Sequence, residues 1–178
     1  GSGAGGLVAL NLLAGAITPQ LTLADINPQA LLYAQVNAAL AGQAGVVCEN
    51  SDVLRSVPDP VDLVLANPPY LVDPQARLYR DGGGSHGCDL SVRIVRESLE
   101  RLAPGGMLIL YTGTVIVAGE DIFLRDILPM LQQPGICYEY GEMDPDVFGE
   151  ELEHPAYAQV ERIAVVSLVV QKPGSRHG

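Results

Sequence analysis

Four consecutive residues, Asn67-Pro68-Pro69-Tyr70, could hold a planar NH2 group. The side-chain oxygen of Asn67 and the backbone carbonyl of Pro68 would accept its two hydrogens and favour positive charge developing on its nitrogen. The prolines stiffen the loop, and the Tyr70 ring can stack on a flat group. This arrangement suits transfer of a methyl cation from an already activated sulfonium, a reaction that mainly needs alignment and no general base.

A second set of residues could bind a nucleotide-like donor. The first six residues, GSGAGG, satisfy G-x-G-x-x-G and, through Gly1, Gly3 and Gly5, the looser G-x-G-x-G. Glycine permits positive φ and lets the backbone approach a nucleotide at a helix N-terminus. Asp25 follows roughly 20 residues later, where a carboxylate can accept hydrogen bonds from both ribose hydroxyls. The alternative role for Asp25 is to cap a turn.

Further candidates for the cofactor site follow the next strand. Asp52 stands at its carboxyl end and could accept a hydrogen bond from an adenine amino group, although it could also be an ordinary loop aspartate. Ile26 and Val53 directly follow the two acidic residues and complete the predicted cofactor set, together with Asn67.

Short apolar strands alternate with helical stretches along the chain, which predicts an α/β fold with a parallel sheet covered on both faces. We expect strands at 21–24, 46–49, 61–66, 107–111, 136–140 and 162–170, and helices at 7–13, 28–41, 90–102 and 121–131. The fold class is a doubly wound, Rossmann-like sheet, mostly parallel, with an antiparallel C-terminal edge strand. Ligands bind at the carboxyl ends of such strands.

The glycine loop of a doubly wound sheet follows a central first strand, and no residues stand before Gly1 to supply it. We therefore expect the native polypeptide to extend at its amino end by at least one strand, as a further segment or domain. Residues 1–172 are predicted to form one domain, with 173–178 as a tail.

Taken together, the glycine loop, Asp25 and Asn67-Pro68-Pro69-Tyr70 resemble the motifs of class I S-adenosylmethionine-dependent methyltransferases, in the small-domain group with the NPPY motif. The resemblance implies a Rossmann-like methyltransferase sheet and S-adenosylmethionine as cofactor. It also implies that the glycines and Asp25 hold the methionine and ribose parts of the cofactor, that Asp52 contacts adenine, and that residues 67–70 bind the acceptor.

A finer similarity follows this motif. The segment 83–89, Gly-Gly-Ser-His-Gly-Cys-Asp, is similar to the G-G-x-x-G-x-D segment of the release-factor glutamine methyltransferases, which implies a protein glutamine amide as acceptor. The chain departs from that family at residues 111–113, where Tyr-Thr-Gly replaces the usual glutamate. The loop 71–87 is a candidate lid whose glycines would permit closure.

Three alternatives remain open. The same motif serves an exocyclic amine of adenine or guanine in RNA or DNA, with Arg77 and Arg80 as candidates for a basic groove. A nicotinamide-dependent dehydrogenase fits the glycines and Asp25 but leaves residues 67–70 without a role. A domain that binds a cofactor or a partner without catalysis is the third.

Composition restricts the partners and the compartment. The net charge of −11 disfavours contact with a nucleic-acid backbone, so a protein acceptor is favoured over nucleic acid. No apolar run reaches the roughly 20 residues that span a bilayer. The three cysteines are widely spaced, which indicates reduced thiols and a cytoplasmic protein. The three histidines have no partners at metal-ligand spacing, so no metal site is expected.

Overall fold

The computed structural model describes residues 20–43, 45–75, 77 and 79–174. The chain divides into two compact units, Gly1–Pro58 and Asp59–Gly178, and each is described by itself. The glycine loop and the helix predicted at 7–13 lie outside the described residues.

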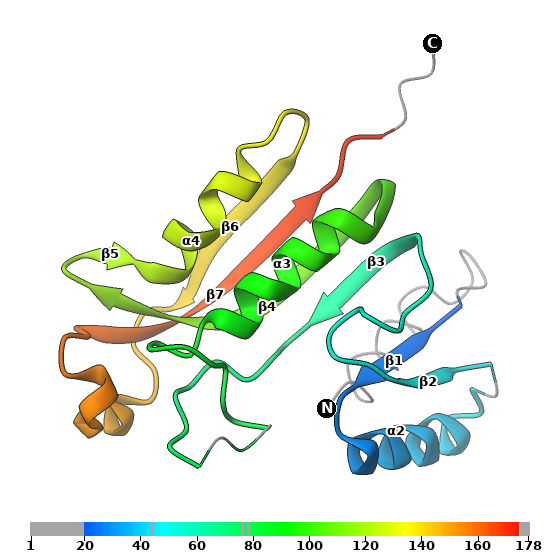
Figure 1. The fold of residues 1–178 in the computed structure, drawn as a ribbon, viewed down its shortest axis with the longest axis horizontal. Helices are drawn as coiled ribbons and strands as arrows, with labels where there is room; N and C mark the ends of the chain where they lie inside the picture. Colours follow the sequence, from blue (N-terminus) through cyan, green and yellow to red (C-terminus); the bar gives the residue numbers. More distant parts are fainter. Residues whose placement is uncertain (1–19, 44, 76, 78, 175–178) are drawn as a thin grey trace. The chain divides into compact units, whose positions relative to one another are not determined.

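The first unit is a small parallel β-α-β arrangement. Strands β1 (Thr22–Asp25) and β2 (Val47–Asn50) pair in parallel and are joined through helix α2 (Pro28–Leu40), as Figure 1 shows. The helix begins there because the Asn27 side chain accepts a hydrogen bond from the Gln29 amide (2.9 Å), while Pro28 occupies the first turn. The two strands and the helix predicted between residues 21 and 49 are confirmed to within one or two residues.

The second unit carries a larger sheet. Its elements are β3 (Val61–Ala66), α3 (Asp89–Arg101), β4 (Leu102–Val117), β5 (Glu120–Asp121), α4 (Ile122–Leu131), β6 (Cys137–Asp144), the 3-10 turns η1 (Gly149–Glu153) and η2 (Pro155–Tyr157), and β7 (Arg162–Gln171). The strand order is β3-β4-β7-β6, and β5 pairs with β4. Strands β3 and β4 are parallel, whereas β7 is antiparallel to both its neighbours. The predicted α/β, Rossmann-like class is confirmed: strands alternate with helices, β1–β2 and β3–β4 pair in parallel, and the C-terminal strands are antiparallel.

The place of the last strand differs from the expectation. β7 is antiparallel, as predicted, but it lies between β4 and β6 and is not the edge strand. The reason is burial: Ile163, Val166, Leu168 and Val170 are at most 1% exposed, so this strand needs neighbours on both sides. β6 takes the edge, where its polar side chains meet water.

Two boundaries also differ. The predicted helix end at residue 102 is wrong, because Leu102 is extended (φ −61°, ψ 137°) and begins β4, where it pairs with Val61. β4 continues well past residue 111, because the β-branched run after it pairs with β7 as far as Ile116.

Helices α3 and α4 pack on one face of this sheet. The Ser91 hydroxyl of α3 bonds that of Thr112 (2.7 Å), and the Phe123 amide of α4 donates to Thr114 (3.1 Å), so the face that carries these threonines also buries Leu108 and Leu110. The opposite face has side chains that are 39–44% exposed: Leu63, Leu65, Ile109 and Tyr111. Within the described part of this unit, helices therefore cover one face of the sheet.

A polar network holds the start of α4 to the sheet. The Asp121 carboxylate caps the helix by accepting from the Leu124 amide (2.9 Å), and it also accepts from the hydroxyls of Thr114 (2.7 Å) and Tyr140 (2.6 Å). Burial raises the pKa of Tyr140, and the bond to Asp121 adds to this shift. The phenol therefore remains a donor at neutral pH.

We expect Asp121→Ala to lower the free energy of unfolding by about 3 kcal/mol, because it removes a helix cap and leaves two hydroxyls without their charged acceptor. Denaturant unfolding measures this loss. Asp126→Ala is the matched control: Asp126 is on the same helix and pairs with Arg125 (2.8 Å) at the surface, so it should change stability by less than about 0.5 kcal/mol. Equal losses in the two variants would refute the capping role.

Candidate functional site

Strand β3 delivers the residues predicted to bind the acceptor. It is parallel to β4 and ends at Ala66, so Asn67-Pro68-Pro69-Tyr70 follow at the carboxyl end of the sheet. The two prolines lack the amide hydrogen that a strand ladder needs, which is why the strand ends there. Asn67 is exposed, whereas the next three residues are half-buried.

Tyr70 is seated on bare backbone of β4. A Cβ placed on Gly113 would lie 2.2 Å from Cδ2 of the Tyr70 ring, so only glycine leaves room for the ring there. Tyr111 lies two residues before Gly113 and shares its face of the strand. Burial raises the pKa of Tyr70, and Tyr111 adds to the shift. The Tyr70 phenol is therefore protonated at neutral pH and is no candidate base.

Gly113 is a residue whose importance the sequence reasoning missed. The available signal was the departure at residues 111–113, where glycine stands close to the position at which the resembling family has glutamate. The structure gives the physical reason for glycine at this place, which is the approach of the Tyr70 ring.

The glycine-rich loop packs against the backbone of the same motif. A Cβ on Gly82 would lie 1.9 Å from the carbonyl oxygen of Gly87 and 2.8 Å from that of Pro69, and a Cβ on Gly87 would lie 2.4 Å from that of Tyr70. These glycines therefore support the motif by close packing. Closure of the loop as a lid stays a prediction.

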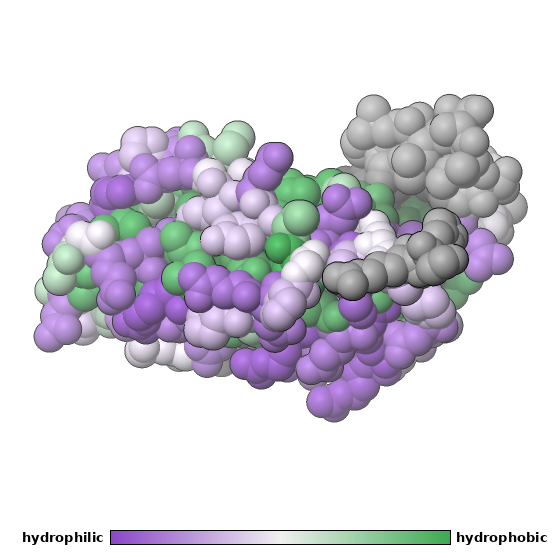
Figure 2. Space-filling model, turned by 90° about the horizontal axis from the view of Figure 1, so that it is seen from above, coloured by the Kyte–Doolittle hydropathy of each residue, from purple (hydrophilic) through white to green (hydrophobic). Residues whose placement is uncertain are grey.

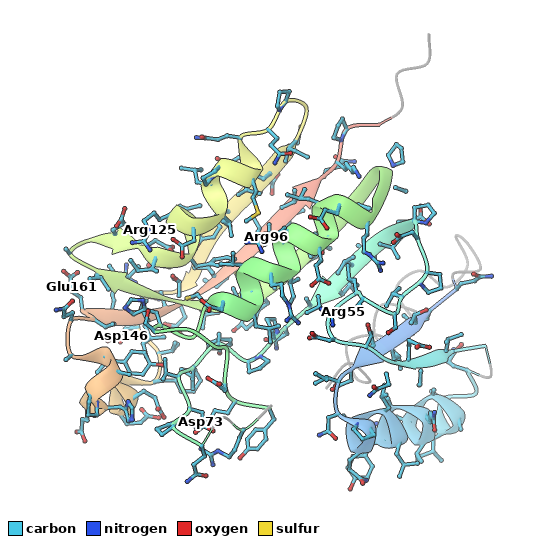
Figure 3. The ribbon with its side chains drawn as sticks, viewed as in Figure 1. Arg55, Asp73, Arg96, Arg125, Asp146 and Glu161 are labelled. Carbon is cyan, nitrogen blue, oxygen red and sulfur yellow. The ribbon has the colours of Figure 1, made fainter. Side chains whose placement is uncertain are left out.

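Asp73 anchors the middle of this loop. Its carboxylate is 1% exposed and accepts bonds from Nε (2.7 Å) and Nη2 (2.6 Å) of Arg77, as well as from the Arg77 amide (2.8 Å). Figure 3 labels Asp73 in the loop after β3. The hydrogen bonds from Arg77 hold the pKa of Asp73 well below its usual range, so the carboxylate is charged at any physiological pH.

Arg77 and Arg80 were the predicted candidates for a basic groove. Arg77 forms the bidentate contact with Asp73, and Arg80 pairs with Glu151 of η1 and lies 3.9 Å from Asp73. Both guanidinium groups are thus neutralised by neighbouring carboxylates. Their surroundings do not resemble a free cationic surface for a phosphate backbone.

The predicted cofactor residues of the first unit stand at one end of its two strands. Asp25 ends β1 opposite Asn50, the last residue of β2. The Asn50 side chain donates to the carbonyl of Ile26 (3.1 Å), and Oδ1 of Asp25 accepts from the Asn27 amide (2.9 Å). Asp25 therefore does cap the turn into α2, and this bond also orients the carboxylate that is predicted to meet the ribose.

The backbone is unusual at Val53, another residue of the predicted cofactor set. Val53, directly after Asp52, has φ 55°, a conformation that β-branched residues rarely adopt. The turn around it is tight: the Ser56 amide donates to the buried Ser51 hydroxyl (2.9 Å), and the Arg55 amide donates to the carbonyl of Asp52 (3.3 Å). Strain of this kind concentrates at ligand sites, and sequence patterns do not reveal it.

The predicted site residues are thus divided. Asp25, Ile26, Asp52 and Val53 lie together in the first unit, and residues 67–70 lie in the second, while Gly1, Gly3 and Gly5 lie outside the described residues. Two cavities of about 510 and 320 Å³ are lined by neither set. Among described residues there is no group of three metal-ligating side chains, and no described helix is long and apolar enough to cross a membrane.

Gly113→Ala should lower the free energy of unfolding by about 1–3 kcal/mol, because the new Cβ overlaps the Tyr70 ring and forces it out of its seat. Equilibrium denaturation measures the loss. Gly141→Ala in β6 is the matched control, since its Cβ would meet nothing closer than Ser167 Oγ at 3.8 Å. An equal effect at both glycines would contradict the seating of Tyr70 on Gly113.

Asp25→Asn should weaken binding of S-adenosylmethionine about 10- to 100-fold, because it removes the charge from the predicted ribose acceptor. The substitution retains an oxygen that can accept from the Asn27 amide, so helix α2 is preserved. Calorimetric titration measures the affinity. Asp62→Asn, which makes the same charge change at an exposed position of β3, should leave it unchanged, and unaltered binding by Asp25→Asn would remove Asp25 from the cofactor site.

Comparison with known proteins places the chain in a family. Residues 1–122 match the family model "Methyltransferase small domain". Release factor glutamine methyltransferases of Deinococcus radiodurans and Cereibacter sphaeroides are 37% and 35% identical over 120 residues each, which is 62% and 61% of this chain and 42% and 43% of theirs. The chain thus spans under half the length of these relatives.

Solved structures agree on the fold. A methyltransferase from Pyrococcus furiosus superposes with a TM-score of 0.59 at 18% identity, over 94% of this chain and 70% of that one. TrmN from Thermus thermophilus gives 0.56 at 20% identity, over 97% and 42%. Identities this low carry the fold alone, but the family model covers more than half of the chain. The chain belongs to the methyltransferase small domain family.

Proposed function

We propose that this protein is an S-adenosylmethionine-dependent N-methyltransferase that acts on a planar NH2 group, with the side-chain amide of a protein glutamine as acceptor. The observation that carries the proposal is the exposed Asn67 at the carboxyl end of β3, followed by two prolines and by a tyrosine seated on Gly113.

The residues of the first unit suit this cofactor. The carboxylate of Asp25 can accept from a ribose diol, and Ile26, which is 48% exposed beside it, offers apolar surface to a flat ring. When bound, S-adenosylmethionine supplies a methyl group on a sulfonium, which is already activated for transfer. The chain therefore needs to bind and align the reactants and need not activate the donor.

In the proposed mechanism, Asn67 and Pro68 act on the acceptor nitrogen. The Asn67 side-chain oxygen and the Pro68 carbonyl accept its two hydrogens and stabilise the positive charge that grows as the nitrogen–carbon bond forms and the carbon–sulfur bond breaks. The nitrogen then loses one proton to water. Tyr70, protonated at neutral pH, contributes a flat surface and takes no part in proton transfer.

Several features favour a protein acceptor over a nucleic acid. The net charge of −11 repels a phosphate backbone. The face seen in Figure 2 is largely hydrophilic, with apolar side chains between the polar ones. The nearby arginines, Arg77 and Arg80, are paired with carboxylates. The curated relatives are named for glutamine methylation of release factors. A factor of protein synthesis as acceptor would place the reaction in the cytoplasm.

Transfer of labelled methyl from S-adenosylmethionine tests the proposal. The full-length protein is incubated with a cell lysate, and the products are split into nuclease-treated and protease-treated halves. Label that survives nuclease and disappears with protease supports a protein acceptor, whereas the opposite pattern would identify a nucleic-acid methyltransferase. Absence of any transfer, with a purified release factor as well as the lysate, would overturn the proposal.

Asn67→Ala should lower the rate of transfer about 10²- to 10³-fold, the size typical of removing one group that stabilises charge in a transition state. Circular dichroism and the thermal unfolding midpoint, measured separately, establish that the variant is folded. Asn37→Ala, at an exposed position of α2, is the control and should transfer at the normal rate. A normal rate in the Asn67 variant would exclude the proposed mechanism.

A further inference from the structure

Phe148 has a backbone conformation that its side chain does not favour. Its φ and ψ are 54° and 43°, in the left-handed region, where a bulky aromatic residue is an outlier. The side chain is nevertheless 39% exposed. Core packing therefore does not explain its conformation. Tyr157, the aromatic residue of the same segment that does pack in the core, is only 1% exposed.

The surrounding backbone holds Phe148 in this conformation. Just before it, the Val147 amide donates to the carbonyl of Ile163 in β7 (2.8 Å), and just after it, the Glu151 amide donates to the carbonyl of Phe148 (2.8 Å). The Glu151 side chain pairs with Arg80 of the loop that follows residues 67–70. Unfavourable backbone geometry that is fixed from several sides is a mark of functional segments.

The same segment is tied to the acceptor motif by a buried contact. The Tyr157 hydroxyl accepts a hydrogen bond from the Val72 amide (2.8 Å), two residues after Tyr70. Tyr157 belongs to an apolar cluster with Leu71 and Val115, against which Tyr70 also packs. The position of Phe148 relative to Tyr70 is therefore set by the fold and not by a free loop.

The two rings leave little room between them. Their centroids are 6.2 Å apart and their planes are inclined by 53°. A flat base held between parallel rings needs about 7 Å, twice the contact distance of about 3.5 Å between carbon atoms. Another part of the Tyr70 ring is occupied by the backbone at Gly113. The Phe148 ring and the backbone at Gly113 thus limit the part of the Tyr70 ring that a ligand can contact.

We propose, on the basis of the function proposed above, that Phe148 is a specificity-determining residue of the acceptor site. Its ring and that of Tyr70 form an aromatic corner that contacts a slender side-chain amide and its aliphatic stem. The same corner does not admit a purine stacked between the rings. The segment after β6 thereby takes part in acceptor binding, although it lies outside all the motifs that the sequence predicted for the site.

Steady-state methyl transfer to a purified bacterial release factor tests this role, with full-length protein. Phe148→Leu should raise KM for the release factor about tenfold, the order expected for loss of an aromatic contact, while kcat and the affinity for S-adenosylmethionine stay near wild type. Phe148→Tyr should restore KM, because it keeps the ring. Tyr138→Leu, an aromatic of β6 that is 41% exposed, is the matched control and should leave KM unchanged.

The outcomes separate the two proposals. If the wild-type protein transfers no methyl group to the release factor, the proposed function fails. If the wild type is active and Phe148→Leu has a normal KM, the role of Phe148 is overturned. A fall in thermal stability of Phe148→Leu together with equal losses in cofactor affinity and transfer would also overturn it, because Phe148 would then be only a structural residue.

Discussion

The contact between the Tyr70 ring and the bare backbone of Gly113 is the constraint on which the proposed acceptor site depends. It requires that β3 and β4 lie side by side in parallel, so that Tyr70, four residues after Ala66, reaches Gly113 in the C-terminal half of β4. It also requires glycine at positions 82 and 87, because the loop returns against the carbonyls of Pro69 and Tyr70. The motif is thus fixed by backbone packing more than by side-chain bonds.

The charges of the second unit fit this reading of the site. Asp73, buried and fully ionised, draws in Arg77, and Glu151 engages Arg80, so the cations near the motif stabilise the loop. An isolated buried carboxylate would be costly, and pairing with a guanidinium removes most of that cost. These two ion pairs therefore stabilise the loop, and Arg77 and Arg80 do not give the site a free positive surface. Such surroundings favour the proposed neutral amide acceptor over a phosphate-linked base.

Sequence patterns predicted the local features of the fold and missed those that depend on distant contacts. The start of α2 at Asn27-Pro28 and the apolar strand β3 depend on residues that are adjacent in the sequence, and both predictions are confirmed. The position of β7 between β4 and β6, and the length of β4, depend on pairing across many residues, which periodicity does not encode. The sequence contains Gly113, but the reason for glycine at this position is the approach of the Tyr70 ring, which only the structure shows.

The outliers of the backbone show why the rest of the site could not be predicted. Three described residues other than glycine have positive φ: Val53, Ala118 and Phe148. Ala118 precedes Gly119 (φ 74°) in the tight β4–β5 hairpin, where two successive positive φ values match the twist of the strands. No hairpin accounts for Val53 and Phe148, which stand beside the predicted adenine contact and beside Tyr70. Such conformations persist only when the surroundings enforce them, and they cluster at functional sites, so their locations agree with the ligand contacts proposed at both places.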